Sequence, residues 1–328
     1  MEITVLHKSN NNTIPLPKNF NMTKLAFVKH MAEAGQHFAP NIEKIFRIVG
    51  MFLHYSFYMQ RSSFCANNCF SRPPDNIYDP TEQGQFSNLV GRAIADFLSK
   101  KIDNSMYTVS YEAAMRLMKL PIQGGMPDLI AFPHKSSYIA IEAKGFERPN
   151  VSDKTNGMVK YKTQAQSGPI KAIGRYVACV SYNLYDPKNG VKCKYYDPPN
   201  DNFKDDGGSL KKELSKGYYS GLLSFMEYFE YEENRYDNEK FYEIKFSNIR
   251  KFNKFFYDEL FPLRPFCSPE IYEFCLKKLR LILPGDIRNF AKEGITDDLK
   301  PFNFEPTEKK DVYKNIYIDN DRVGLRYY

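Results

Sequence analysis

Tryptophan is absent from this 328-residue sequence, and long apolar runs and cysteine are scarce. The longest uncharged apolar stretch, residues 48–59, is too short for a helix that spans a bilayer, which needs about 20 residues. The N-terminus also lacks the apolar segment of a secretion signal. These absences predict a cytoplasmic protein without a membrane partner, in which residues 48–59 belong to a buried helix.

The six cysteines give little support for a metal site or a disulfide framework. Cys65 and Cys69 are spaced like half of a zinc site, but no second pair or histidine set follows at ligand spacing. His54 is the nearest further candidate. We therefore expect no structural zinc, and we expect reduced thiols, as is usual in the cytosol.

A large excess of either charge is also missing, since the net charge is only +7. The positive charge is concentrated, because residues 78–200 hold 16 Lys/Arg and 11 Asp/Glu and so carry five of the seven charges. This distribution mildly favours a polyanionic partner. A basic cleft and an ordinary solvated surface both remain open from charge alone.

The chain divides into three regions. Residues 22–34 and 41–60 show helical spacing, so residues 1–76 are interpreted as a helical N-terminal region. Three prolines within 72–80 mark a boundary, and residues 77–200 form the predicted core. Residues 201–328 are interpreted as a mostly helical C-terminal region that ends in a hairpin over 312–328, with its turn at 319–321.

The predicted core alternates between helical and strand patterns. A helix begins near Thr81, strands follow at 107–111, 128–132 and 138–144, helices at 158–166 and 169–175, and a hairpin at 176–185 and 191–196. This order is typical of an α/β fold built on a mixed β-sheet flanked by helices.

The segment 124–145 carries the candidate chemistry. Side chains of a strand alternate between its two faces, so Glu142 and Lys144 share one face and Ala143 lies on the other. A turn folds the preceding strand back, which brings Asp128 toward Glu142 and Lys144. Two carboxylates and one ammonium are therefore expected to converge at the end of an apolar hairpin.

Charges at such a place are costly unless they are paired or bind a metal ion. Two carboxylates with open water positions suit Mg²⁺, for which Mn²⁺ substitutes. A cation held there activates water and stabilises charge on a phosphate, which is what phosphodiester hydrolysis requires. The alternatives are a chance arrangement of exposed strand-end charges in an unrelated enzyme, and a non-catalytic binding module.

Pro127-Asp128 and Glu142-Ala143-Lys144, with glycines before and after, resemble the signature of the PD-(D/E)XK nuclease superfamily. The resemblance covers residues 80–196 and implies a restriction-endonuclease-like α/β core. It also implies that Asp128, Glu142 and the carbonyl of Ala143 bind the metal ion, and that Lys144 assists the attacking water.

Many members of that superfamily add an acid on the helix before the motif and a glutamine on the helix after it. Glu82 is the first candidate for the acid, with Asp96 as the alternative, although an acid in a first helical turn is also favoured by the helix dipole. Gln164 is preferred over Gln166 for the glutamine.

The resemblance also implies nucleic acid as the partner, and four basic residues are candidates for phosphate contacts: Lys160, Lys162, Lys171 and Arg175. The expected activity is Mg²⁺-dependent cleavage within DNA, most simply by a restriction or antiviral-defence nuclease. Repair, recombination or RNA-cutting nucleases are alternatives with the same fold. A homodimer would suit the cutting of two strands, and no small-molecule cofactor is expected.

Overall fold

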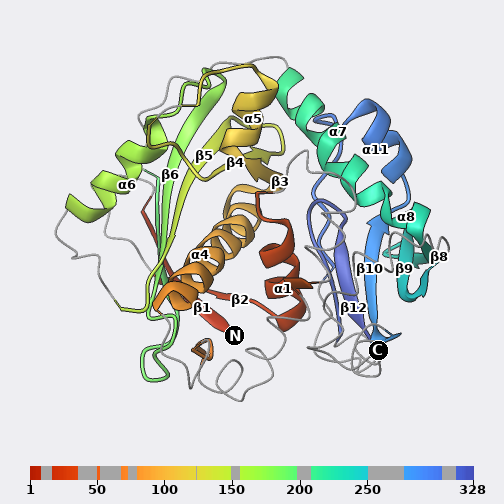
Figure 1. The fold of residues 1–328 in the computed structure, drawn as a ribbon, viewed down its shortest axis with the longest axis horizontal. Helices are drawn as coiled ribbons and strands as arrows, with labels where there is room; N and C mark the ends of the chain where they lie inside the picture. The colour runs from red at the N-terminus through yellow and green to blue at the C-terminus, as the bar shows by residue number, and fades with distance from the viewer. Residues whose placement is uncertain are drawn as a thin grey trace.

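Two β-sheets organise the residues that this computed structural model describes, which are 1–8, 17–35, 50–51, 68–72, 80–122, 124–148, 156–197, 208–249, 277–304 and 315–328. The fold is a mixed α/β arrangement, with helices packed on both sheets (Figure 1). The predicted α/β class with a mixed sheet is therefore confirmed. Most of the apolar stretch 48–59 lies outside the described residues.

The first sheet has seven strands in the order β2-β1-β7-β6-β5-β4-β3. Their bounds are β1 Glu2–Lys8, β2 Pro17–Asn21, β3 Ser105–Ser110, β4 Leu129–Pro133, β5 Tyr138–Gly145, β6 Ile173–Tyr182 and β7 Lys192–Tyr196. Strands β5 and β6 are parallel, as are β1 and β7, whereas β3, β4 and β5 form an antiparallel meander. The predicted hairpin 176–185 with 191–196 is present as β6 and β7.

Two helices lie on opposite faces of this sheet, so that β5 and β6 run between them in Figure 1. Helix α4 (Pro80–Asp103) approaches so closely that a Cβ on Gly145 would lie 2.0 Å from the carbonyl oxygen of Ser87. Helix α6 (Asn156–Gln166) covers the other face, where Lys162 donates to the carbonyl of Tyr176. Because side chains alternate along β5, Gly145 points toward α4 and Lys144 points away from it.

The second sheet has the order β11-β12-β10-β9-β8. Its strands are β8 Phe229–Tyr236, β9 Glu239–Ile249, β10 Leu279–Pro284, β11 Ile316–Ile318 and β12 Gly324–Tyr327. Helices α7 (Ser209–Leu223), α8 (Phe225–Tyr228) and α11 (Ile287–Glu293) accompany it. One hydrophobic core joins the two sheets, since Ile141 of the first and Leu281 of the second belong to the same cluster of buried side chains.

The C-terminal region therefore differs from the mostly helical region that the sequence predicts. The alternation of apolar and charged residues over 242–246 is typical of a strand, and this segment belongs to β9. Glu243 is nevertheless buried, where it accepts hydrogen bonds from Asn234 and Arg326. The predicted terminal hairpin is confirmed as β11 and β12.

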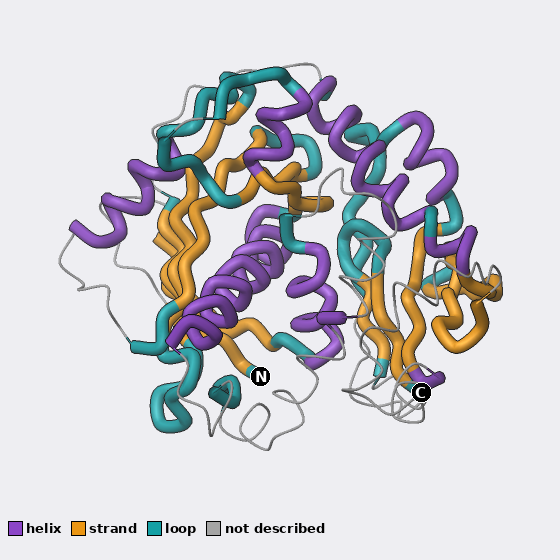
Figure 2. Tube along the Cα trace, in the orientation of Figure 1, coloured by secondary structure: helices purple, strands orange, loops and turns teal. Residues whose placement is uncertain are grey.

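Three further local differences separate the structure from the sequence-based expectations. Residues 169–175 are not helical, because β6 already begins at Ile173. A short helix, α5 (Tyr111–Leu117), follows β3 and was not expected. The N-terminal region contributes strands β1 and β2 to the first sheet in addition to the expected helix, α1 (Lys24–Glu33), so residue 76 is not a boundary of that sheet. Figure 2 shows α1 beside α4 in the part of the molecule between the sheets.

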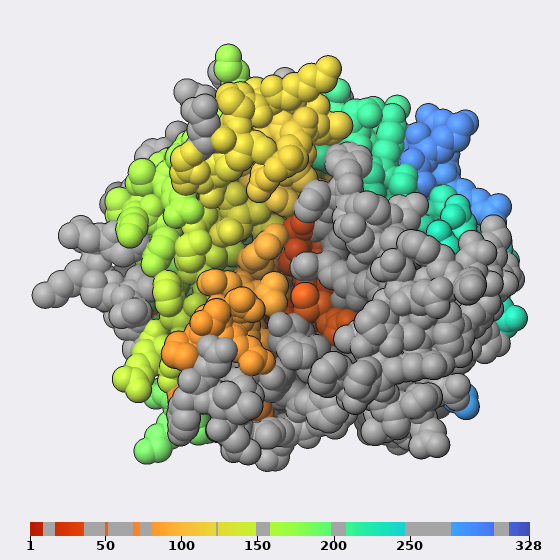
Figure 3. Space-filling model, viewed as in Figure 1, coloured from red at the N-terminus to blue at the C-terminus, as the bar shows by residue number. Residues whose placement is uncertain are grey.

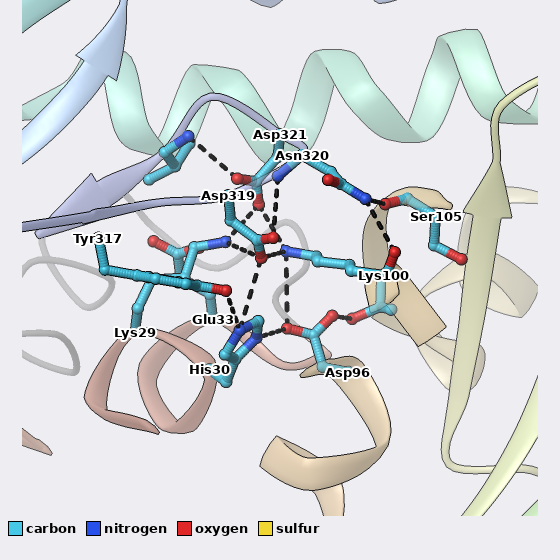
Figure 4. Close-up of polar contacts among 12 residues, drawn as sticks. Lys29, His30, Glu33, Asp96, Lys100, Ser105, Tyr317, Asp319, Asn320 and Asp321 are labelled. Atoms are coloured by element: carbon cyan, nitrogen blue, oxygen red, sulfur yellow. Dashed lines mark hydrogen bonds and ion pairs between the residues drawn. The ribbon is translucent and has the colours of Figure 1, made fainter. Parts of the chain in front are cut away.

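A group of buried charged and polar side chains joins α1 and α4 to the turn between β11 and β12 (Figure 4). This buried turn cluster consists of Lys29, His30 and Glu33 of α1, Asp96 and Lys100 of α4, and Asp319, Asn320 and Asp321 of the turn. The Nζ atoms of Lys29 and Lys100 lie 2.6 and 2.8 Å from Oδ2 of Asp321. Residues nearly 300 positions apart are thereby held together by charges that are shielded from solvent.

The close approach of α4 to β5 leads to a first test by substitution of glycine. Gly145→Ala places a methyl group against the backbone of Ser87, and we expect it to lower the free energy of unfolding by about 1–3 kcal/mol or more. Gly84→Ala on the same helix is the control, because nothing lies within 4 Å of its added Cβ and alanine is the better helix former. The free energy of unfolding of Gly84→Ala should exceed that of the wild type by about 0.5–1 kcal/mol. Urea unfolding measures both, and equal stability of the two variants would contradict the packing.

Candidate active site

Asp128, Glu142 and Lys144 converge, as the sequence predicts. Asp128 directly precedes β4, and its backbone N–H donates to the carbonyl of Ile141 on β5 at 3.0 Å. The ammonium of Lys144 forms an ion pair with Oε1 of Glu142 and lies 3.5 Å from Oδ2 of Asp128. The three side chains thus share the face of the sheet that is turned away from α4.

The three side chains differ in their access to solvent. The side chain of Glu142 is fully buried, whereas those of Asp128 and Lys144 remain 29% and 27% exposed. Neither carboxylate oxygen of Glu142 has a hydrogen bond of good geometry among the described residues, so its ion pair with Lys144 is its main compensation. A substrate can reach Asp128 and Lys144 from outside while Glu142 lies behind them.

The electrostatics follow from this burial. Burial and then the neighbouring charge of Asp128 raise the pKa of Glu142 to about 8, against the opposing effect of Lys144. Burial acts to lower the pKa of Lys144, but Asp128 and Glu142 outweigh it and raise that pKa. Two carboxylates that repel one another beside a single ammonium form a site that gains stability from an added cation.

Hydrogen bonds from the surrounding backbone hold the site in place. The N–H of Ala143 donates to Oδ2 of Asp128 at 2.9 Å, which fixes that carboxylate against β5. The N–H of Tyr111, at the start of α5, donates to the carbonyl of Asp128 at 3.2 Å. Gly124 begins residues 124–127, the segment that leads to Asp128, and it has a φ of +74°, a conformation that favours glycine.

Gln164, the glutamine that the sequence analysis prefers, lies beside residues 124–127, which precede Asp128. Its Nε2 donates to the carbonyl of Met126 at 3.3 Å. Gln166, two positions later on α6, is exposed. Ser167 was not singled out in the sequence, yet its hydroxyl donates to the carbonyl of Gly125. No local pattern marks a serine after a helix for such a role.

Neither candidate for the helix acid joins the pair of carboxylates. Glu82 lies in the first turn of α4, nine residues before Gly91 and so about 13 Å along the helix from it. A Cβ on Gly91 would meet the carbonyl carbon of Lys144, so Glu82 lies beyond the end of β5 on the far face of the sheet. Asp96 belongs to the buried turn cluster, where Nδ1 of His30 lies 2.6 Å from its Oδ2.

The four basic candidates fall into two groups. Lys160 and Lys171 are exposed and available to phosphates. Lys162 is buried against Tyr176, and Arg175 forms ion pairs with Asp103 and Asp197. A phosphate would have to displace these internal partners, so the structure favours only the first pair as phosphate contacts.

The donor set fits a hard divalent cation but is small. Asp128 and Glu142 supply oxygen ligands, and Ala143 stands between Glu142 and Lys144 with its N–H already bound to Asp128. No cluster of three or more Asp, Glu, His or Cys side chains within the described ranges is arranged to hold a metal ion. Water and substrate oxygens would complete the coordination, as is usual for Mg²⁺.

No family model, no curated protein and no solved structure matches this chain. Among the described helices, none is both long and apolar enough to cross a bilayer. The site is therefore interpreted from its own residues.

Figure 3 shows that the face seen in Figure 1 includes surface atoms of α4, in orange, and the exposed residues of that helix lie mainly in its first half.

The raised pKa of Glu142 generates a second test, on the metal-free protein. The folded state holds a proton on Glu142 that the unfolded chain has released between pH 4.5 and about 8, so stability from this group falls as pH rises through that window. We expect Glu142→Gln to exceed the wild type in free energy of unfolding by about 1–3 kcal/mol near pH 8.5, with a smaller gain near pH 5.

Urea unfolding at the two pH values measures this difference. Glu227→Gln is the control, because Glu227 is an exposed residue of α8. A Glu142→Gln variant that is less stable than the wild type at the higher pH would contradict the assignment of a desolvated carboxyl.

Proposed function

We propose that this chain is a metal-dependent nuclease of the PD-(D/E)XK type that cleaves phosphodiester bonds within DNA. The observation that carries the proposal is the convergence of Asp128, Glu142 and Lys144 on one face at the end of β5, with Asp128 and Lys144 open to solvent. Two neighbouring carboxylates beside one lysine, with Glu142 fully buried, are costly for the fold, and such a cost is typical of functional sites.

The order of elements supports the restriction-endonuclease-like core. Helix α4, the meander of β3, β4 and β5, helix α6 and the hairpin of β6 and β7 follow one another apart from the added α5. Glu142 and Lys144 stand near the end of β5, beside a parallel neighbour, β6, which is the central strand of the sheet. Asp128 joins them from the start of β4, and Asp128 and Lys144 are open to solvent there.

In this proposal Asp128, Glu142 and the carbonyl of Ala143 would hold a Mg²⁺ ion. The ion would lower the pKa of a water molecule and offset charge on the scissile phosphate. Glu142 would serve as a ligand in its ionised form, and Lys144 would then lie on the solvent side, away from its present contact with Glu142. Its ammonium is placed to orient the attacking water or to neutralise the phosphate as charge develops.

Other residues have supporting roles. Gln164 holds the backbone before Asp128, which keeps that carboxylate in register with Glu142. Lys160 lies within α6 and Lys171 lies five residues after its end; both are exposed and so open to phosphates. A restriction or antiviral-defence nuclease is the proposed context, in which the second sheet would serve recognition or assembly.

A third test is plasmid cleavage by the wild type and by Lys144→Gln, with Mg²⁺, Mn²⁺ or EDTA. We expect metal-dependent nicking or linearisation that the substitution reduces by about 100-fold or more, as is typical for the loss of a charge-stabilising group. Lys135→Gln is the matched control, because Lys135 is an exposed lysine in the turn at the other end of the β4–β5 hairpin.

Circular dichroism establishes that each variant remains folded. Cleavage that survives in Lys144→Gln at the wild-type rate would overturn the assignment of the site. Absence of cleavage of plasmid, linear DNA, single-stranded DNA and RNA by the wild type would favour a non-catalytic binding module.

A further inference from the structure

The turn between β11 and β12 is held by charges rather than by apolar packing. Lys29 and Lys100 each approach both Asp319 and Asp321, at distances from 2.6 to 3.1 Å. Nδ2 of Asn320 donates to the carbonyls of Lys100 and Ser105 at 3.1 and 2.9 Å. The turn is therefore bound to α1, α4 and the start of β3 at once (Figure 4).

The fixed charges of the buried turn cluster do not balance. Two lysines face three aspartates, and Glu33 would add a fourth carboxylate in a site that is almost fully buried. Excess charge without water is costly, and a protein avoids the cost by neutralising one member. The cluster thus requires a proton in addition to those of its lysines.

The hydrogen bonds around Tyr218 of α7 show where that proton resides. The hydroxyl oxygen of Tyr218 lies 3.0 Å from Oε2 of Glu33 and 2.8 Å from Oδ2 of Asp321. A hydroxyl has one hydrogen and cannot donate to two carboxylates. Both contacts are satisfied when a protonated Glu33 donates to Tyr218 and Tyr218 donates to Asp321.

His30 does not need to carry the proton. Its Nδ1 lies 2.6 Å from Oδ2 of Asp96, and its Nε2 lies 2.9 Å from the hydroxyl of Tyr317. A neutral imidazole that donates from Nδ1 and accepts at Nε2 satisfies both neighbours. Burial also lowers the pKa of His30, which keeps the ring neutral near pH 7.

We propose that the turn Asp319–Asp321 is a pH-sensitive clasp, which is closed on α1 and α4 while Glu33 is protonated and loosens when Glu33 loses its proton. Loss of that proton places a fourth anion beside Asp321 and removes the donor that Tyr218 accepts from. The shared hydrophobic core continues to hold the second sheet and includes Tyr317, Val323 and Leu325 of the hairpin, so the opening begins at the turn.

The direction of the pH dependence follows from Glu33 and the charges that face it. Glu33 contacts Lys29 of α1 and Tyr218 of α7, and the charges of Asp321 and Lys100 act on it. Asp96 and Asp319 lie one step further away, where they pair with Lys100. Burial raises the pKa of Glu33 to about 7, and Lys29 opposes this effect more strongly than Asp321 adds to it. An acid whose pKa is raised by folding stabilises the fold less as pH rises, so the clasp weakens from pH 4.5 to about 7 and stays weak above that.

Hydrogen exchange of the amides in β11 and β12, corrected for the intrinsic pH dependence of exchange, tests the clasp in the full-length protein. Between about pH 6 and pH 8.5 we expect the protection of these amides in the wild type to fall about tenfold, because the opening constant rises up to tenfold per pH unit below about pH 7 and levels off above it. Glu33→Gln, which keeps a neutral donor at the same place, should remove this fall. Glu227→Gln on α8 is the control and should behave as the wild type.

An infrared measurement keeps the proposal testable if Glu33→Gln does not fold. In the Glu142→Gln background, which removes a second carboxyl of raised pKa, the carbonyl band of a protonated carboxylic acid should be strong near pH 6 and weaker by about pH 8.5. Absence of the band at pH 6, or protection that does not depend on pH in the wild type, would overturn the proposal.

Discussion

The ion pairs between Lys29, Lys100 and Asp321 are the interaction on which the position of the β11–β12 turn against α1 and α4 depends. Each lysine is fully buried, so removing Asp321 would leave two desolvated ammoniums with fewer partners, and breaking such a contact from one side is among the most costly changes a protein undergoes. The pairs also join α4 to the turn between β11 and β12. The second sheet is thus attached to the first by charge as well as by the shared core.

Helix α4 connects this buried turn cluster to the candidate active site. Its second half carries Lys100 into the cluster, and its first half packs on the end of β5, where Gly91 and Gly145 allow the backbones to touch. With α4 occupying one face of β5 so closely, Glu142 and Lys144 project from the other face. The position of the proposed nuclease site is therefore a consequence of strand alternation combined with a tight contact between helix and strand.

Much of the site was predictable because its signals are local. The apolar strands around Asp128 and Glu142 are short and clearly bounded, and period-two alternation alone places Glu142 and Lys144 together. The position of Gln164 beside the motif also follows from the helix after β5. The failure of Glu82 and Asp96 to join the site could not be foreseen, because the choice depends on which face α4 covers. Gly91 and Gly145 determine this face, because they let α4 pack directly against β5.

The remaining features depend on contacts between distant residues. Lys29 and Asp321 are 292 positions apart, and nothing in the sequence near either one indicates that both are buried. Glu243 similarly has the charge of an exposed strand position, and its burial is understood only when Arg326 is placed beside it. Periodicity identifies faces of single elements, whereas burial of charge is decided by the partners that folding brings together.

The most direct test of the nuclease account is a crystal structure with Mn²⁺, in which anomalous scattering locates the ion. The account predicts one ion bound by the carboxylates of Asp128 and Glu142, with the ammonium of Lys144 displaced from its present contact with Glu142. An ion that binds elsewhere, or a Glu142–Lys144 pair that persists unchanged at saturating Mn²⁺, would contradict it.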